Sequence, residues 1–465
     1  MSNLICDVAI IGAGTAGLAA ERAARQAGAK TLLIDDRFAG TTCASVGCMP
    51  SKLLIAAANA AYNIKRSAVF GVHTNDSQVD GQAVMARVRK ERDAFVAATL
   101  QSIRELPSGV CIQQTARFFN ETTLALKDGR TISAKSVVIA TGARPSVPKL
   151  FANLGSLLQT NETIFELPSL PRSMAVIGAG PLGLELAQAF ARLGVDIELF
   201  EQTDHIGGLK DGEVAQVLKS VLRKEFPMHF NAKLEAVSDA GLARVRWSGE
   251  STGAKSFERV LVATGRPPAL DLDSTGISFD DRGAPKVDEA TLQCGDAPIF
   301  LAGDAAGSRP VVHEASADGY IAGRNAAAFP NVQKGHRFVP LSLIFLDPPV
   351  AVVGAPSTDR SIVGTATFAD QGRAKIEDRN TGLIRLYADR DSRLSGATLM
   401  GPAMDHIAHL LAWAIERKQT IGDMLTLPFY HPTLEEGLKP ALRQICEAVK
   451  APELEWLGDL PPPGA

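Results

Sequence analysis

The 465-residue sequence carries little net charge and contains no long apolar run. Its formal net charge is −3, which gives no electrostatic basis for binding nucleic acid or anionic lipid. No stretch of 18 or more uninterrupted apolar residues occurs, so we expect no transmembrane helix. The apolar N-terminus lacks a basic segment and is interrupted by glycines and by Asp7, which argues against a signal peptide. We therefore expect a cytoplasmic protein.

Cysteine is scarce, since the chain has only six. Four of them are scattered and do not form the framework of a disulfide-rich protein, so we expect small buried hydrophobic residues at these positions. The scattered four are Cys6, Cys111, Cys294 and Cys446. The other two, Cys43 and Cys48, stand five positions apart in "GTTCASVGCMPSK" (residues 40–52). Their spacing needs a separate explanation.

Glycine, in contrast, is abundant and lies in a repeated pattern. Residues 6–36 and 173–202 each read as an apolar strand, a Gly-x-Gly-x-x-Gly turn, an alanine-rich helix, a second apolar strand and an acid. In both segments the acid follows the first glycine by 23 positions. A lone Gly-x-Gly-x-x-Gly is a weak signal, but here each copy has its strand, helix and acid in place. The sequence therefore predicts two dinucleotide-binding βαβ units.

Each residue of these two fingerprints has a physical role. The first glycine makes the turn, the second lets the backbone approach a pyrophosphate, and the third allows close packing of helix and strand. The helix N-terminus supplies positive potential. The acids are expected to accept hydrogen bonds from ribose hydroxyls, and a carboxylate at the second site repels a 2′-phosphate and so predicts NAD over NADP. The residues are Gly12, Gly14, Gly17 and Asp35 in the first unit and Gly178, Gly180, Gly183 and Glu201 in the second. Two sites in one chain predict two different dinucleotides.

The remaining segments differ in the secondary structure that they predict. The length suggests about three domains at ~150 residues each. A helical stretch spans about residues 50–105, and Asp128-Gly129 predicts the turn of a hairpin over 124–132. Two segments match each other as strand, Ala-Thr-Gly, Arg and Pro, namely 136–148 and 259–270. A further strand over 297–307 ends on Asp304. After about residue 335 an α+β texture begins, with an amphipathic helix over 405–420.

Taken together, these elements resemble the FAD-dependent pyridine nucleotide–disulfide oxidoreductases, and among them the dihydrolipoamide dehydrogenases. The resemblance covers essentially the whole chain. Besides the fingerprints and the two Ala-Thr-Gly stretches, it is carried by Cys-x4-Cys-x-Pro-Ser-Lys at 43–52, Ala-Gly-Asp at 302–304 and "HPTLEE" at 431–436. It implies an α/β fold with two Rossmann-like dinucleotide-binding domains, for FAD and NAD, plus a C-terminal α+β dimerisation domain. The expected segments are an FAD domain with the redox cysteines (1–147), an NAD domain (148–267), a central domain completing the FAD site (268–335) and a dimerisation domain (336–465).

Three explanations compete for Cys43 and Cys48. A zinc site needs further Cys or His at metal spacing, and none stands near them. A structural disulfide meets a geometric obstacle, because residues five apart in an ideal helix have Cα atoms roughly 8.6 Å apart, whereas a disulfide needs ~4.4–6.8 Å. Distorted backbone at Gly47 and Pro50 can relieve this. So small a loop adds little stability, so a redox couple is the better reason for the pair.

The resemblance implies a role for each site residue. Cys48 lies against the flavin and Cys43 exchanges with the substrate. Lys52 approaches the flavin and pairs with Glu185; the simpler alternative is two solvated helix charges. His431 is the base, oriented by Glu436, and serves the other subunit of a homodimer, whereas a lone His before Pro is more often a turn residue.

Further contacts follow from the same resemblance. The remaining FAD residues are Thr42, Lys52, Ala116, Thr141, Gly142, Asp304 and Val312, and the remaining NAD residues are Glu185, Gly265 and Arg266. No resident metal is expected. One departure from the family pattern is Thr41, which replaces a glycine and would be strained if that position required φ > 0; we expect the position to be tolerant.

The implied activity moves two electrons between dihydrolipoamide and NAD through FAD and Cys43–Cys48. The lipoyl group is free or is held on a carrier such as a 2-oxo acid dehydrogenase complex. Pro-Ser-Lys at 50–52 favours this branch over the glutathione branch, which usually has two lysines there. The alternatives left open are an NADH-dependent reductase of another small disulfide or of a metal ion, and a non-catalytic flavin-binding subunit. The retained Cys43, Cys48, His431 and Glu436 speak against the last.

Overall fold

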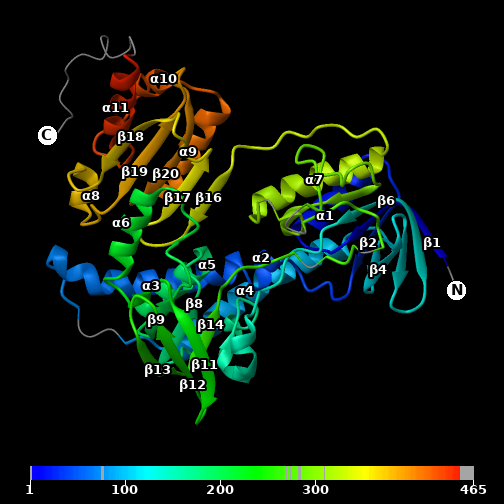
Figure 1. Cartoon of the computed structure of the whole chain (residues 1–465), viewed down its shortest axis with the longest axis horizontal. Coiled ribbons are helices and arrows are strands. Elements are labelled where there is room, and N and C mark those ends of the chain that lie inside the picture. The colour runs from blue at the N-terminus through cyan, green and yellow to red at the C-terminus, as the bar shows by residue number, and fades with distance from the viewer. Residues whose placement is uncertain are drawn as a thin grey trace.

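The computed structural model describes residues 3–74, 78–268, 270–272, 274–280, 284–307 and 309–450. Figure 1 shows three groups of elements, each built around its own sheet. The first sheet contains β1 and lies on the right of the view, the second contains β8 and lies below, and the C-terminal sheet contains β17 and lies at the upper left. The last part of the predicted C-terminal segment, residues 451–465, lies outside the described residues.

The first sheet has parallel and antiparallel halves. Its order is β3-β2-β1-β6-β5-β4, with β15 also paired to β6. Strands β3, β2, β1, β6 and β15 run parallel, while β4, β5 and β6 form antiparallel pairs. The bounds are β1 Asn3–Ile11, β2 Thr31–Asp35, β3 Cys111–Gln113, β4 Ala116–Asn120, β5 Thr123–Leu126, β6 Thr131–Ile139 and β15 Ile299–Leu301. The β5–β6 turn has Gly129 at φ +87°, which confirms the predicted hairpin.

Two helices beside the first sheet approach each other unusually closely. They are α1 (Thr15–Gln26), which follows the first fingerprint, and α7 (Val312–Ala328). On α7, a Cβ at Gly319 would collide with the carbonyl oxygen of Ala16, and one at Gly323 with that of Ala20. Only glycine permits this separation, so backbone packs on backbone. The short η4 (Gly303–Ala306) connects β15 toward α7.

The segment between β2 and β3 forms a helical arm that packs away from the first sheet. It comprises α2 (Thr42–Ser45), α3 (Cys48–Arg66), η1 (Ser67–Phe70) and α4 (Gly81–Arg104), as the helical texture predicted. Its buried Leu54, Ala58, Met85 and Val88 join the hydrophobic core of the second βαβ unit. The cysteines at the base of the arm are therefore placed between the two units.

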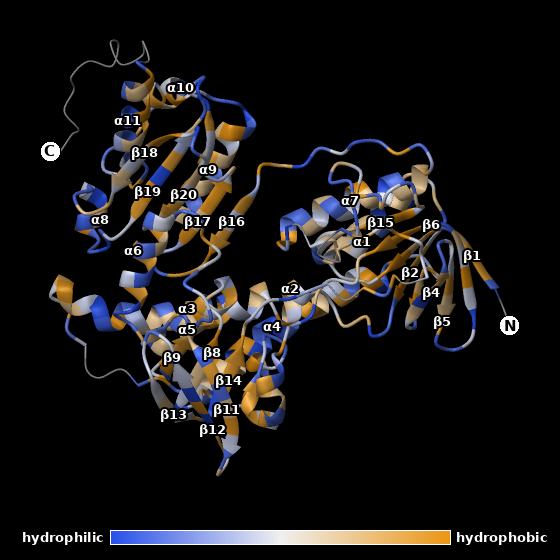
Figure 2. Ribbon diagram, viewed as in Figure 1, coloured by the Kyte–Doolittle hydropathy of each residue, from blue (hydrophilic) through white to orange (hydrophobic). Residues whose placement is uncertain are grey.

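The second unit is a parallel sheet of order β10-β9-β8-β14-β7, flanked by the antiparallel sheet β11-β12-β13. Figure 2 shows its central strands mostly in the hydrophobic colour, as expected for strands buried on both faces. The helices beside it are α5 (Pro181–Arg192), which follows the second fingerprint, and α6 (Gly212–Leu222). The remaining bounds are η2 Lys149–Leu157, β7 Leu158–Gln159, η3 Ile164–Glu166, β8 Ser173–Ile177, β9 Asp196–Phe200, β10 Met228–His229, β11 Lys233–Asp239, β12 Leu242–Ser248, β13 Gly253–Phe257 and β14 Arg259–Val262.

The C-terminal module is an antiparallel sheet of order β16-β17-β20-β19-β18 with helices packed on it. It has its own buried core, and its amphipathic helix α9 lies where the sequence predicted. The bounds are β16 Leu341–Ile344, β17 Val350–Gly354, β18 Ile362–Thr367, α8 Gly372–Ile376, β19 Leu383–Ala388, β20 Leu394–Met400, α9 Met404–Glu416, α10 Ile421–Leu425, η5 Glu435–Leu438 and α11 Lys439–Val449. Among the described residues, no helix is both long and apolar enough to cross a bilayer.

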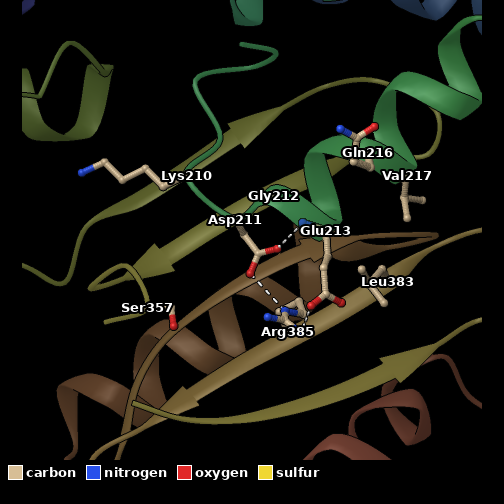
Figure 3. Close-up of a pocket in the computed structure, with 9 residues that line it drawn as sticks. All are labelled: Lys210, Asp211, Gly212, Glu213, Gln216, Val217, Ser357, Leu383 and Arg385. Atoms are coloured by element: carbon tan, nitrogen blue, oxygen red, sulfur yellow. Dashed lines mark hydrogen bonds and ion pairs between the residues drawn. The ribbon is translucent and has the colours of Figure 1, made fainter. Parts of the chain in front are cut away.

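A charged junction joins the second unit to this module (Figure 3). Asp211 caps α6 by accepting from the N–H groups of Glu213 and Val214, both at 3.1 Å. Its other oxygen accepts from Arg385 Nε at 3.0 Å and from Tyr387 Oη at 2.8 Å, both on β19. A cavity of about 780 Å³ opens beside these residues. Its lining contains no cysteine or histidine, so it does not coincide with the predicted redox site.

Candidate active site

The two cysteines lie on either side of a break between helices. Cys43 is inside α2 and Cys48 is the first residue of α3, so the pair does not sit in one continuous helix. Gly47 caps α3 with φ −123° and ψ −116°, and a Cβ there would press on Thr42 and Cys43. The distorted backbone predicted at Gly47 is confirmed. It brings the two thiols to one place.

Thr41 is unstrained, as expected for a tolerant position. Its neighbour Gly40 takes the positive φ of +87°, whereas Thr41 has an extended φ of −86°. The Thr41 side chain accepts a hydrogen bond from Ala44 N at 3.2 Å and so caps α2. Thr41 therefore caps the first helix of residues 40–48, the segment that carries both cysteines and is called the redox loop below.

The two thiols have opposite acidities. Both are free thiols in this structure. The hydrogen bond between the side chains lowers the pKa of Cys48 to about 6, because Cys43 donates to the Cys48 sulfur; burial opposes this shift and the charge of Lys52 assists it. The same hydrogen bond and burial raise the pKa of Cys43 far above its usual range. Near neutral pH the reduced pair is thus a Cys48 thiolate beside a Cys43 thiol.

Lys52 and Glu185 form an ion pair across the two units, as the family resemblance implied. Lys52 lies one turn after Cys48 on α3, and its Nζ is 2.8 Å from Glu185 Oε2 on α5. The Glu185 side chain is 6% exposed and that of Lys52 is 32% exposed, so these are not two solvated charges. Glu185 Oε1 accepts a further hydrogen bond from the backbone N–H of Phe345, at 2.9 Å. The ring of Phe345 lies under Lys52, with Nζ 4.4 Å from its centroid.

A buried amide connects the redox loop to the ends of both βαβ units. Asn161 donates through Nδ2 to the carbonyl of Val46, at 3.0 Å, and accepts at Oδ1 from Arg266 Nη1, at 2.8 Å. Arg266 also donates to the carbonyl of Ala143 at 2.6 Å. The sequence predicted Arg266 as an NAD residue; in the structure its guanidinium faces the redox loop and the first Ala-Thr-Gly stretch.

The two fingerprints have the same backbone construction. Gly12 and Gly178 have φ of +102° and +109°, and a Cβ on either would collide with the carbonyl oxygen of Ala140 or Ala263. By contrast, a Cβ on Gly14 or Gly180 would meet nothing within 4 Å. These second glycines precede the N-termini of α1 and α5, so they leave an open cradle beside unpaired helix N–H groups. The residues present therefore fit a dinucleotide pyrophosphate at each unit.

The acids of the two units also match each other. Asp35 Oδ2 accepts from Ala13 N, and Glu201 Oε2 accepts from Ala179 N, each at 2.9 Å. The acids thus hold the fingerprint loops in place, a role that sequence reasoning missed. Each acid accepts two further hydrogen bonds, Asp35 from Arg37 N and Phe38 N and Glu201 from Thr203 N and Oγ1. A carboxylate has about four acceptor positions, so about one on each acid remains for a ribose hydroxyl.

The other predicted cofactor residues gather where the connecting stretches meet. The two Ala-Thr-Gly stretches run antiparallel, with Ala143 bridged to Pro268 and Ser146 N donating to the Gly265 carbonyl at 3.0 Å. Gly142 has φ +70° and follows Thr141 at the end of β6. Asp304 lies in η4, where burial raises the pKa of its carboxyl and the charge of Arg266 opposes the rise. Ala116 begins β4, Thr42 begins α2, and Val312 begins α7.

The proposed base lies on the C-terminal module. His431 Nδ1 is 3.0 Å from Glu436 Oε2, which confirms the predicted pairing and leaves Nε2 of the ring for another partner. The His431 side chain is half-exposed, whereas that of Glu436 is largely buried. The structure of one chain thus presents two groups, the thiols with Lys52 and Glu185, and His431 with Glu436.

The scattered cysteines behave mostly as expected. Cys6, Cys294 and Cys446 are buried, and burial raises the pKa of Cys6 and of Cys294 to about 12. Cys111 is only partly buried, because β3 is a sheet-edge strand, but it packs against the core of the first unit. Phe345 and Asn161 were not predicted at all. Neither belongs to a motif, and each reaches the site from a distant part of the chain.

Comparison with known proteins gives two family models that cover most of the chain. The model of the pyridine nucleotide-disulphide oxidoreductases matches residues 6–319, and that of their dimerisation domain matches residues 341–442. Dihydrolipoyl dehydrogenase of Haloferax volcanii is 30% identical over 94% of this chain and 95% of its own length. Mercuric reductase of Shigella flexneri is 30% identical over 95% of this chain and 81% of its own length. A solved structure of the HOCl-induced flavoprotein disulfide reductase RclA from Escherichia coli, a Cu(II) complex, shares the fold with a TM-score of 0.80 and 22% identity, over 95% of this chain and 99% of that one.

Proposed function

Because the chain belongs to the pyridine nucleotide–disulphide oxidoreductases, whose cofactors are FAD and NAD, we propose that it transfers two electrons between a dihydrolipoyl dithiol and NAD. The observation that carries this proposal is the placement of Cys43 and Cys48 on either side of the break between α2 and α3, one helical turn from the partly buried Lys52–Glu185 ion pair. The shifts of the two thiol pKa values, down for Cys48 and up for Cys43, agree with such a redox pair. A flavin-binding subunit without catalysis has no need for such a pair. The dimerisation domain supports a homodimer.

The thiol chemistry follows from the two acidities. A substrate thiolate attacks the sulfur of Cys43 in the oxidised pair, the Cys43–Cys48 bond breaks, and Cys48 leaves as a thiolate. The thiol of lower pKa is the faster leaving group, which assigns this role to Cys48. The second substrate thiol then displaces Cys43 as a thiol, giving the substrate disulfide and two electrons stored on the cysteine pair. FAD, when bound, supplies the two-electron path from this pair to NAD.

Proton transfer is the role proposed for His431. Imidazole titrates near neutral pH, and Glu436 at Nδ1 fixes the ring so that Nε2 can take a substrate proton. We place this ring at the thiols of the partner subunit, as the family resemblance implies. The pairing of His431 with an acid and the dimerisation-domain match support this placement.

Each βαβ unit is proposed to hold one cofactor. The first would hold FAD between the Gly14 cradle, Asp35, the two Ala-Thr-Gly stretches, Asp304 and the start of α7. The second would hold NAD at the Gly180 cradle with Glu201. We also propose the segment limits 1–147, 148–267, 268–335 and 336–465 for the four domains, and the cytoplasm as location.

The lipoyl group is the substrate supported best, since this chain spans 95% of the dihydrolipoyl dehydrogenase from Haloferax volcanii but 81% of the mercuric reductase from Shigella flexneri. The similarity to a mercuric reductase favours a metal ion as a second candidate.

The test is NADH oxidation by the purified flavoprotein with free lipoamide, beside glutathione disulfide and Hg(II), with NADPH replacing NADH in a parallel series. We expect fast turnover with NADH and lipoamide and slow turnover in every other combination. Reduction of the flavin by NADH without lipoamide turnover would overturn the substrate and leave the cofactors in place. Turnover with Hg(II) alone would favour the second candidate.

A further inference from the structure

Phe345 belongs to the C-terminal module but contacts both members of the Lys52–Glu185 pair. It follows β16 directly and is half-buried. Its backbone N–H occupies Glu185 Oε1, so Oε2 of the same carboxylate remains for Lys52. Its ring lies at cation–π distance from the ammonium, 4.4 Å from the centroid. Phe345 therefore contacts Glu185 through its backbone N–H and Lys52 through its ring.

The loop that carries Phe345 is fastened along α5. Asp347 N donates to Gln188 Oε1 at 2.9 Å, and Gln188 Nε2 donates back to the Asp347 carbonyl at 3.0 Å. One turn further, Arg192 Nη1 lies 2.9 Å from Asp347 Oδ2. Glu185, Gln188 and Arg192 share one face of α5, because they are spaced by three and four residues. The loop is thus held in register with Glu185.

Arg192 also connects this loop to α3, the helix that begins with Cys48 and is called the redox helix below. Its guanidinium lies over the ring of Tyr62 on α3, with Cζ 3.6 Å from the centroid, and it donates to Asn59 Oδ1 at 3.2 Å. Gln188 and Arg192 are both buried. The helix with Cys48, the helix with Glu185 and the loop with Phe345 therefore form one connected unit.

Without the ring, the ion pair with Glu185 would be the one fixed contact of the Lys52 ammonium within the part of the chain that the structure describes. Its stem is flexible and its side chain is one-third exposed, so the ammonium could turn toward water and away from the thiols. The pair with Glu185 alone does not prevent this, because a partly exposed ion pair gains little from one geometry. An aromatic face under the ammonium adds a second direction of attraction.

We propose that Phe345 is a positioning residue that keeps the charge of Lys52 directed at Cys48. The inference rests on the proposed redox role of Cys48 but not on the identity of the disulfide substrate. It makes the C-terminal module part of the thiol site within the same chain. The Cys48 thiolate of a chain with a smaller apolar residue at 345 should therefore be less stabilised.

The test uses the holoenzyme with Cys43→Ser, in which Cys48 is the only thiol of the pair and a hydroxyl can still donate to it. The pH dependence of the thiolate-to-flavin charge-transfer absorbance then reports the Cys48 thiolate without any substrate. In Phe345→Leu we expect the midpoint of this titration to move to higher pH. At a pH below the midpoint, the charge-transfer absorbance should be about threefold smaller than in the parent. Phe345→Tyr keeps the ring and should behave as the parent. Phe119→Leu, at an exposed site on β4, is the matched control and should also behave as the parent.

A double variant separates positioning from general damage. If Phe345 acts through Lys52, Phe345→Leu should have no further effect on the titration when Lys52→Met is already present. An equal shift with and without Lys52 would overturn the inference, as would superimposable titrations of parent and Phe345→Leu. A parent that shows no charge-transfer band at any pH would overturn the proposed function and this inference with it.

Discussion

The two βαβ units share one backbone design, but their helices are used differently. Two residues after the third glycine, α1 has Ala19 and α5 has Glu185. Ala19 lies in the close packing of α1 on α7, next to Gly319, where only small side chains fit. Glu185 instead reaches out of its own unit to Lys52 on the redox helix. The glycines thus form the same open cradle in both units. The residue two positions after the third glycine decides which element the helix contacts, α7 in the first unit and α3 in the second.

The contrast continues along the two helices. Small residues keep α1 against α7, so the first unit is held by backbone contact. On α5, Gln188 and Arg192 follow Glu185 with hydrogen bonds and ion pairs to the Asp347 loop and to Glu225. The first unit is therefore held together by close backbone packing. The other is built for charged contact with the thiols and with the C-terminal module.

The largest effect is expected from filling the close contact of the first unit. Gly319→Leu would force a side chain into the backbone of α1 at Ala16, so we expect a loss of about 3 kcal/mol or failure to fold with flavin bound. Thermal unfolding and the flavin-to-protein ratio measure this. Gly212→Ala in the second unit is the control, because a Cβ there meets nothing within 4 Å. Equal stability of both variants would refute the packing argument.

The second effect should fall on electron transfer and leave folding intact. Glu185→Ala leaves Lys52 and the Phe345 N–H without their partner, and we expect NADH-dependent turnover to fall about 10- to 100-fold. Flavin content and unfolding temperature should stay close to those of the parent. Glu235→Ala, at an exposed position on β11, should leave turnover unchanged. If Glu185→Ala matched this control in stopped-flow reduction, the coupling through α5 would be wrong.

The paired acids should separate the two cofactors. In Glu201→Gln the repulsion of a 2′-phosphate is removed, so the preference for NADH over NADPH, as a ratio of kcat/KM, should fall about tenfold. Asp35→Asn in the first unit should lower the flavin content and leave this ratio unchanged. A shift of nucleotide preference in Asp35→Asn would mean that the cofactors are assigned to the wrong units.

The smallest effect is a pH dependence of the thiol pair. Cys48 has a pKa of about 6, lowered chiefly by the hydrogen bond from Cys43, so its thiolate is present above that pH and is lost as pH falls through it. In the reduced holoenzyme, the charge-transfer absorbance should fall accordingly. Cys43→Ala removes the donor and should move the titration to higher pH, while Cys43→Ser should move it less. Identical titrations for both variants would contradict the assigned hydrogen bond.

Much of this architecture could be predicted from local sequence. Each fingerprint predicts its turn, helix and acid within about 25 residues. Gly47 likewise predicted the distorted backbone between the cysteines. The pairing of Lys52 with Glu185 came only from the family resemblance, because no local pattern joins two residues so distant in the chain.

Other parts of the site could not be predicted because they depend on tertiary contacts. The amphipathic arm around α3 must bury a face, but its pattern does not say that Leu54 joins the core of the second unit. Phe345 is one apolar residue after a strand, and only the packed structure shows its ring under Lys52. Asn161 belongs to no motif, and its bonds to Val46 and Arg266 arise from the meeting of three segments.

The most direct test of the account follows electrons from NADH to the thiols. The oxidised holoenzyme is mixed with NADH without oxygen, then denatured in labelled iodoacetamide, and the peptide containing Cys43 and Cys48 is analysed by mass spectrometry. We predict two labels on this peptide after NADH and none before it, while Cys446 labels equally in both samples. Bleaching of the flavin by NADH with no new label on Cys43 and Cys48 would contradict the account.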